Sequence, residues 1–334
     1  MNTKRIISLA ASLALVLSLS VGLTGCGDKT AQDDNQGEPA ADSAKYTVGV
    51  CQLVQHDALD AATQGFIDAL NEALPGQVEI VTKNASGDSA NCSTIVNGFV
   101  SDNVDLIMAN ATPALTAAAA ATKDIPILGT SITAYGVALD IDDFNGTVGG
   151  NISGTSDLAD LEAQADMITE WFPEAKKVGL LFCSAEPNSL YQVEEVAKYL
   201  SAKGIESQQF AFTDTNDVAS VTQSAADYAD VIYAPTDNTA ASNTEAIANV
   251  VLPAGVPVIA GESGICGGCG IATLSISYYD LGYTTGKMAV KILTGEADIS
   301  QMPVEFATQT SKMYNAANMD TLGITPPEGY SPLS

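Results

Sequence analysis

The fold is decided by the stretch at residues 46–82, which reads YTVGVCQLVQHDALDAATQGFIDALNEALPGQVEIVT. Its first eight residues form a run typical of a buried strand, and residues 57–74 repeat apolar side chains at helical spacing. Pro75-Gly76 ends this helix, and a second strand is expected at residues 78–82. A strand, a helix and a strand in this order predict two parallel strands joined by a helix that packs across them.

The same alternation continues along the chain and starts again after Gly149-Gly150. Short strands that alternate with helices predict a parallel sheet covered on both faces. Since no long linker separates the two halves, we expect an α/β protein with two doubly wound parallel-sheet lobes. The further strands are expected at residues 104–109, 125–129, 177–183, 205–212, 230–234 and 256–260, and the further helices at residues 88–100, 113–123, 158–172, 190–200, 218–228 and 239–251.

The composition excludes several classes of protein. The 334 residues include 13 Lys+Arg and 40 Asp+Glu, so the formal net charge is −27. A chain this acidic is repelled by the phosphates of nucleic acids, so no nucleic-acid partner is expected. With 46% hydrophobic and 16% charged residues the chain is not wholly disordered, and one apolar run of near-spanning length excludes a multi-span membrane protein. The length suits two domains with a sizeable core.

The N-terminus has the features of a targeting sequence. Two basic residues precede an apolar run over residues 6–23, and Leu23-Thr24-Gly25-Cys26 resembles a bacterial lipobox. The resemblance implies a signal peptide at residues 1–25, cleavage before Cys26 and lipidation of that cysteine; an uncleaved anchor helix is the alternative. Residues 26–45 are then the lipidated Cys and a disordered tether, because the segment is acidic and lacks large apolar side chains.

Five further cysteines follow Cys26, and an odd number cannot all pair: Cys51, Cys92, Cys183, Cys266 and Cys269. The spacing Cys266-Gly-Gly-Cys269 is that of a redox motif or of half a zinc site, but no second Cys or His pair completes a zinc site. The alternative is a Gly-rich loop with two small residues, with or without a disulfide. We expect no cofactor and no metal.

Six groups of residues carry a family resemblance through their order and spacing: VGVCQ and HDALD at 48–60, DLI and ATP at 105–113, GGNISGTSD at 149–157, EPNS at 186–189, PTDNT at 235–239 and YYDLG at 278–282. Over nearly all of residues 46–300 the chain resembles the substrate-binding proteins of ABC transporters with the type I periplasmic-binding fold, and more narrowly the tryptophan/tyrosine-type branch. It departs from that pattern at Ala134-Tyr135, where the family usually has Asp-Pro.

The resemblance implies a chain path and a setting. Lobe 1 would comprise residues 46–155 plus 278–296, and lobe 2 residues 156–274 plus 300–334, joined by a hinge of three crossovers. The protein would be a monomer on the extracytoplasmic face of a bacterial cell membrane, held there by its lipid anchor. Its partners would be a small-molecule ligand and an ABC permease with a cytoplasmic ATPase.

Candidate ligand-binding residues lie where the expected strands end, since ligands of parallel sheets bind at the carboxyl ends of the strands. In lobe 1, Thr112, Ser131 and Thr133 offer hydroxyls for a carboxylate without any basic residue. Thr112 has an alternative role as the N-cap of the helix that Pro113 begins.

Lobe 2 offers acids and amides for an ammonium group. The candidates are Asn188, Asp237, Asn238 and Glu262, with Glu262 or Asp237 supplying the charge. Asp237 has an alternative role as a helix cap, whereas Glu262 has no such evident role.

Two more candidates, Gln52 and His56, follow the first strand. His56 would stack on an aromatic ligand or donate a hydrogen bond to it, and an ordinary loop histidine is the alternative.

These observations predict a binding protein rather than an enzyme. The single histidine is the only base available to a catalytic triad, and neither a Gly-x-Ser-x-Gly elbow nor a P-loop is present. We expect a receptor for ABC import that captures a small zwitterion between the lobes. The expected zwitterion is an amino acid, and an aromatic amino acid is the narrower form of this hypothesis. Other small polar ligands (a peptide fragment, nucleoside or sugar) are the alternative, and an extracytoplasmic hydrolase is a weaker one.

Overall fold

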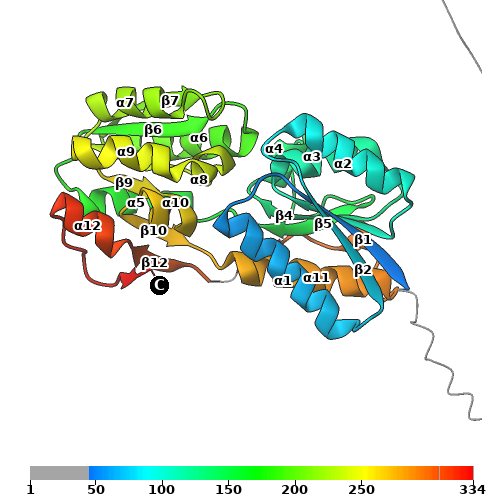
Figure 1. Ribbon diagram of the computed structural model, residues 1–334. Helices are drawn as coiled ribbons and strands as arrows, with labels where there is room; N and C mark the ends of the chain where they lie inside the picture. Colours follow the sequence, from blue (N-terminus) through cyan, green and yellow to red (C-terminus); the bar gives the residue numbers. More distant parts are fainter. Residues whose placement is uncertain (1–44, 308, 334) are drawn as a thin grey trace, which may run out of the picture. The chain divides into compact units, whose positions relative to one another are not determined.

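The structure is a computed structural model that describes residues 45–307 and 309–333, and it contains two β-sheets with helices on both faces (Figure 1). The expected signal peptide, the lipidation site at Cys26 and the tether lie outside the described residues. None of the helices in the described ranges is long and apolar enough to cross a membrane.

The first lobe is built on a six-stranded sheet in the order β11-β5-β4-β3-β1-β2, in which all paired strands are parallel. Helices α1 and α11 cover one face, where Phe66 and Met288 are buried, and α2 and α3 cover the other, where Phe99 and Leu115 are buried. The elements are β1 (Tyr46–Gln52), α1 (Asp57–Ala73), β2 (Val78–Asn84), α2 (Ser89–Ser101), β3 (Leu106–Asn110), α3 (Thr112–Ala121), β4 (Ile127–Ile132), α4 (Tyr135–Leu139), β5 (Ile152–Ser156), α11 (Tyr278–Leu293), η1 (Ile299–Gln301) and β11 (Glu305–Phe306).

The second lobe is built on a seven-stranded sheet in the order β13-β12-β10-β9-β8-β6-β7. Only β10 and β12 pair antiparallel. Helices α5 and α6 bury Ile168 and Val196 on one face, and α7 and α9 bury Val218 and Ile247 on the other. The elements are α5 (Leu161–Trp171), β6 (Lys177–Cys183), α6 (Pro187–Ala202), β7 (Glu206–Phe212), α7 (Val218–Tyr228), β8 (Val231–Ala234), α8 (Asn238–Ser242), α9 (Thr244–Ala254), β9 (Val258–Ala260), α10 (Ser263–Gly268), β10 (Ala272–Ser275), β12 (Ser311–Tyr314), α12 (Ala316–Leu322) and β13 (Ser331–Pro332).

The chain passes between the two sheets three times: after β5, after β10 and after β11. The prediction of two parallel-sheet α/β lobes is therefore confirmed. One detail differs, because β11 pairs with β5 of the first sheet although the tail from about residue 300 was expected in the second lobe. The tail enters the second sheet only at β12.

Three local expectations also need correction. The helix expected at residues 239–251 is two helices, α8 and α9, with Asn243 between them. Thr112 is the first residue of α3 and not its N-cap, a position that Ala111 occupies with a φ of 87°. The Cys-Gly-Gly-Cys segment is not a loop, since Cys266 lies in α10, and all five described cysteines are buried and free.

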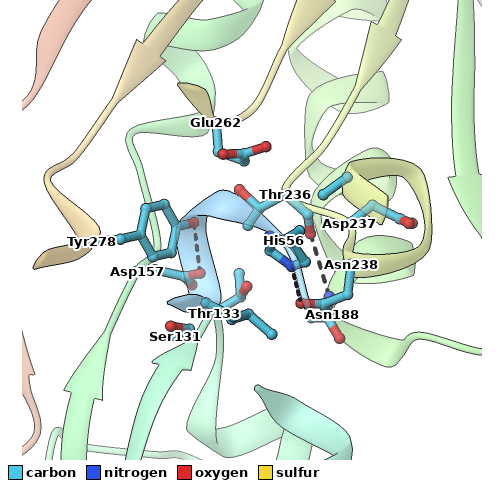
Figure 2. Close-up of a pocket in the computed structure, with 12 residues that line it drawn as sticks. His56, Ser131, Thr133, Asp157, Asn188, Thr236, Asp237, Asn238, Glu262 and Tyr278 are labelled. Carbon is cyan, nitrogen blue, oxygen red and sulfur yellow. Dashed lines mark hydrogen bonds between the residues drawn. The ribbon is translucent and has the colours of Figure 1, made fainter. Parts of the chain in front are cut away.

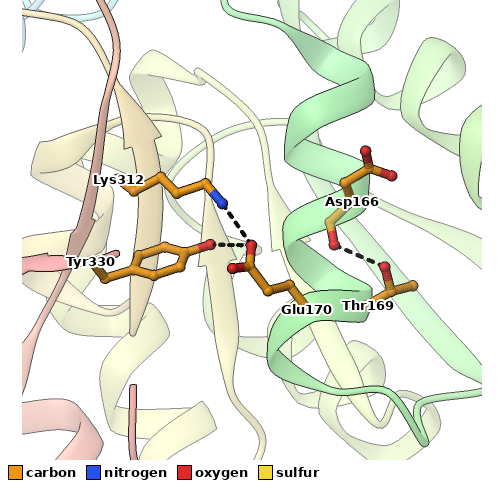
Figure 3. Close-up of polar contacts among 5 residues, drawn as sticks. All are labelled: Asp166, Thr169, Glu170, Lys312 and Tyr330. Carbon is orange, nitrogen blue, oxygen red and sulfur yellow. Dashed lines mark hydrogen bonds and ion pairs between the residues drawn. The ribbon is translucent and has the colours of Figure 1, made fainter. Parts of the chain in front are cut away.

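Polar contacts hold the C-terminal segment against the second lobe (Figure 3). Glu170 of α5 accepts hydrogen bonds from Lys312 Nζ of β12 at 2.8 Å and from Tyr330 Oη at 2.9 Å. The Tyr330 ring meets Trp171 edge to face, with centroids 5.0 Å apart. These contacts explain why Trp171, on the apolar face of α5, is buried.

Candidate functional site

A pocket lies among the ends of strands from both sheets (Figure 2). It encloses about 280 Å³ of empty space, part of it open to solvent. The first lobe contributes residues after β1, β4 and β5, and the second lobe contributes residues after β6, β8 and β9. The residues that line it are His56, Leu59, Ser131, Thr133, Asp157, Asn188, Thr236, Asp237, Asn238, Ala241, Glu262 and Tyr278.

Seven of the nine candidate ligand-binding residues meet at this pocket: His56, Ser131, Thr133, Asn188, Asp237, Asn238 and Glu262. The structure does not bring Gln52 and Thr112 there. The Gln52 side chain is held inside the first lobe, where it accepts from Thr63 Oγ1 at 2.6 Å and donates to Asp60 Oδ1 at 2.6 Å. Thr112 is buried at the start of α3.

The most informative residue that the sequence reasoning missed is Asp157. It follows β5 directly, so the rule of strand ends applies to it as well. It was missed because the strand at residues 152–156 was not predicted, although the segment was part of the family resemblance. Tyr278, at the start of α11, was also missed. Its side chain contacts Asp157 in the pocket, and Asp157 itself had not been predicted.

Asp157 is the carboxylate of the pocket that accepts the fewest hydrogen bonds from the protein. Its Oδ2 accepts a hydrogen bond from Tyr278 Oη at 3.0 Å, whereas its Oδ1 is buried and has no partner. Burial raises the pKa of Asp157 to about 6, against the opposing effect of hydrogen bonds from Thr133 and Tyr278. No Lys or Arg lines the pocket, so a cation brought by a ligand is the natural partner of this carboxylate.

The other two acids of the pocket cap helices. Asp237 accepts hydrogen bonds from Ala240 N at 2.7 Å and from Cys183 N at 2.6 Å. It therefore caps helix α8, as the alternative interpretation of this residue predicted. Glu262 is also a cap, which was not expected, because it accepts from Gly264 N at 2.6 Å and from Ile265 N. Burial raises the pKa of both carboxyl groups.

Four buried polar atoms without a hydrogen-bond partner belong to residues that line the pocket: His56 Nδ1, Ser131 Oγ, Asp157 Oδ1 and Asn188 Oδ1. Only eight such side-chain atoms are found in the described ranges, so half of them gather at this site. Each costs about 1–3 kcal/mol when left unpaired. Buried polar groups are normally satisfied, and a cluster of unsatisfied ones indicates a binding site for a polar molecule.

Ser131 has a strained backbone in addition to its free hydroxyl. It lies where the pairing of β4 with β5 shifts register between Gly129 and Ile132, and its φ is +56°. Bulges and left-handed non-glycine residues are costly and occur preferentially at functional sites, where they re-aim a side chain. Here the bulge presents Ser131 Oγ to the pocket.

One hydrogen bond joins the two lobes through the pocket. His56 Nε2 lies 3.3 Å from Asn238 Oδ1 (Figure 2). Asn238 Nδ2 in turn donates to Glu186 Oε2 at 2.7 Å. Because this bond to Glu186 fixes the amide, His56 Nε2 meets an acceptor and therefore carries the proton. In the tautomer with its proton on Nε2, the Nδ1 atom is a hydrogen-bond acceptor.

A family model described as ABC transporter substrate binding protein matches residues 47–332. The chain belongs to this family. Among the described residues, no group of three or more His, Cys, Asp or Glu side chains is placed to hold a metal ion.

Several relatives within the family have been named or solved. A tyrosine-binding protein of Clostridioides difficile is 32% identical over 328 residues, which cover 96% of this chain and 93% of the relative. The ABC domain from Streptococcus pneumonia, solved in complex with L-Trp, is 32% identical with a TM-score of 0.82, over 86% of this chain and 100% of that one.

A second solved relative, a ligand-free, open substrate-binding protein with adhesive properties from Clostridium difficile, is 36% identical with a TM-score of 0.66, over 86% of this chain and 99% of that one. The structure thus superposes better on the complex than on the open form, although the open form is the closer of the two in sequence. This agrees with the direct contact between His56 and Asn238 across the lobes.

Proposed function

We propose that this member of the family is the lipid-anchored receptor of an ABC importer and that it captures an amino-acid zwitterion in the pocket. The observation that carries the proposal is the set of four unpaired buried polar atoms at the pocket, one of which belongs to a carboxylate that has no basic partner. Attachment through Cys26 is supported by the lipobox-like sequence, and the transport role by the family.

Three of the four atoms match the two ends of a zwitterion. Asp157 Oδ1 and Asn188 Oδ1 are acceptors, as an ammonium group requires. Ser131 Oγ is a free hydroxyl donor for the carboxylate end. Charge-assisted hydrogen bonds of this kind are about twice as strong as neutral ones.

The nature of the ligand's side chain is supported by the relatives. One is named for tyrosine and another was solved with L-Trp, so an aromatic amino acid is the ligand class we propose. A neutral sugar or nucleoside would leave the Asp157 carboxylate without a counter-charge. A hydrolase has less support, because the one side-chain hydrogen bond of His56 among the described residues is with the Asn238 amide and not with a Ser or Cys.

The test is calorimetric titration of the purified protein, unfolded and refolded beforehand to remove any bound ligand, with a panel of amino acids, nucleosides and sugars. We expect binding of aromatic amino acids and none of their N-acetyl forms, which lack the ammonium charge. Asp157→Asn should weaken binding by at least about 30-fold, since removing one partner of a buried charge pair costs about 2–5 kcal/mol.

Asp157 is a better choice for this test than Glu262, whose replacement would also remove a helix cap. Asp320→Asn, an exposed acid of α12, is the matched control and should leave the affinity unchanged. Wild-type affinity in Asp157→Asn, or binding of sugars alone, would refute the zwitterion site.

A further inference from the structure

A second cavity with mainly apolar walls adjoins the polar pocket. It encloses about 520 Å³ of empty space, part of it open to solvent. The first lobe contributes Tyr135, Val137 and Phe144, and the second lobe contributes Leu158 and Tyr191. Phe306 of β11 completes the wall.

The apolar cavity and the polar pocket are neighbours along three segments of the chain. Thr133 lines both of them. Ser156 lines the apolar cavity, while the next residue, Asp157, lines the polar pocket. Asn188 and Tyr191 lie three residues apart on the first turns of α6 and so on one face of that helix, each facing a different one of the two spaces.

The polar pocket alone is poorly suited to an aromatic side chain. Nine of the twelve residues that line it carry a hydroxyl, amide or carboxylate group. Cavities that bury small organic ligands have mainly apolar and aromatic walls. The adjoining cavity supplies such walls.

The apolar cavity is also where exposed hydrophobic side chains gather. Only four large hydrophobic side chains are exposed in the described ranges, and two of them line this cavity: Val137 at 43% and Phe306 at 53%. On a chain with a net charge of −27, apolar side chains that converge from two lobes indicate a binding surface.

The wall contributed by Tyr135 is held rigidly. Its hydroxyl donates to Gly129 O at 3.1 Å and to Thr155 O at 3.2 Å, and its ring stacks on Phe144 with centroids 6.3 Å apart. Tyr135 belongs to the Ala134-Tyr135 departure from the usual family pattern. The departure therefore falls in the apolar cavity and not among the polar atoms.

We propose that the apolar cavity receives the side chain of the bound amino acid and selects for large apolar or aromatic ones, with Tyr191 and Val137 as specificity-determining residues. This inference rests on the proposed function, because it places the ammonium and carboxylate groups in the polar pocket. Recognition is then divided between two spaces. The polar pocket binds the ammonium and carboxylate groups that all amino acids share, and the apolar cavity contacts the side chain, which differs among them.

The test compares affinities of the full-length protein for L-tryptophan, L-tyrosine, L-phenylalanine, L-leucine and L-alanine by calorimetry. Tyr191→Ala should weaken binding of the three aromatic amino acids at least about tenfold relative to L-alanine, since apolar contacts the size of a methylene or more are lost. Val137→Asp, at a position that is 43% exposed, should likewise weaken binding of the aromatic amino acids relative to L-alanine.

Leu190→Ala is the matched control, because Leu190 is exposed on α6 beside Tyr191 but lines none of the described cavities. It should leave the order of affinities unchanged, and Asp157→Asn should lower all affinities by a similar factor. If Tyr191→Ala and Val137→Asp keep the wild-type order, this inference is wrong while the zwitterion site stands. If the wild-type protein binds no amino acid, the proposed function fails and this inference with it.

Discussion

At the scale of single residues, the site depends on carboxyl groups that are buried without basic partners. Asp237 and Glu262 are partly compensated by the backbone N–H groups that they cap, whereas Asp157 caps no helix and has only the hydroxyl groups of Thr133 and Tyr278. Helix N-termini carry partial positive charge, so capped acids are stabilised within the protein itself. Asp157 therefore depends most on a ligand for its counter-charge.

Asp157 predicts a pH dependence of both stability and binding. Its pKa is raised from 3.8 to about 6, so the folded, empty protein favours the protonated form. The resulting stabilisation is complete below about pH 4 and is lost as the pH rises through about 6. An ammonium ligand needs the ionised form of Asp157. The affinity should therefore rise by about tenfold from pH 5, which lies about one unit below this pKa, to pH 7.

Calorimetry of wild type and Asp157→Asn at pH 5, 6 and 7 checks this prediction. The variant should have a weaker and flatter affinity profile, and its melting temperature should fall less than that of the wild type over the same range. Proton release on binding, measured in buffers of different ionisation enthalpy, should appear near pH 6 in the wild type only. An affinity of the wild type that does not change between pH 5 and 7 would contradict the role of Asp157.

At the scale of elements, the packing of α1 on α11 positions two residues of the pocket. His56 precedes α1 and Tyr278 begins α11, so the separation of these helices sets the separation of the two side chains. The helices touch through their backbones: a Cβ on Gly282 would overlap the carbonyl oxygen of Ala62, and one on Gly65 would overlap that of Tyr279. Only glycine allows this approach.

Gly282→Ala is expected to lower the free energy of unfolding by about 1–3 kcal/mol, because the added methyl group forces the two helices apart. Gly98→Ala is the matched control, since Gly98 lies in helix α2 and a methyl group added there would meet no atom within 4 Å. That change should raise stability by up to about 1 kcal/mol through lower unfolded-chain entropy. Urea denaturation checks both, and equal effects of the two substitutions would contradict the close contact.

The elements that sequence patterns predicted well are those with strong apolar periodicity, such as α7, whose bounds were expected at the residues observed. Strand β5 was missed because ISGTS is polar and small, and it is buried only through contacts that the rest of the fold provides. Asp157, which directly follows this strand, was therefore not predicted as a pocket residue. The break at Asn243 is likewise set by a local contact, the bond from its Nδ2 to Thr239 O at 2.8 Å.

The same limit explains the outcome for the candidate site. The rule of strand ends located seven pocket residues, because parallel strands bring their carboxyl ends to one edge. It failed for Gln52, whose side chain is taken up by Thr63 and Asp60 of the following helix. The orientation of a side chain at a strand end depends on such partners, and the strand pattern does not contain them.

At the scale of the whole molecule, the net charge of −27 opposes the compact state. Within residues 45–307 and 309–333 only three ion pairs are found, those of Lys198 with Glu195, Lys203 with Asp166, and Lys312 with Glu170. Most acidic side chains therefore have no cationic partner in the described part of the chain. Repulsion among them is long-ranged at low ionic strength and is screened by salt.

Salt should consequently stabilise this protein, whereas proteins that depend on surface ion pairs lose stability in salt. Raising NaCl from about 0.02 M to about 0.5 M shortens the screening length from roughly 20 Å to roughly 4 Å. We expect the urea midpoint to rise over this range, and urea is the suitable denaturant because it adds no ions. A variant with Asp142→Asn, Asp320→Asn and Glu328→Gln, all at exposed positions, should start from a higher midpoint at low salt and gain less from NaCl. A midpoint that falls with salt would mean that attractive charge pairs, and not repulsion among the acids, dominate the electrostatics of the fold.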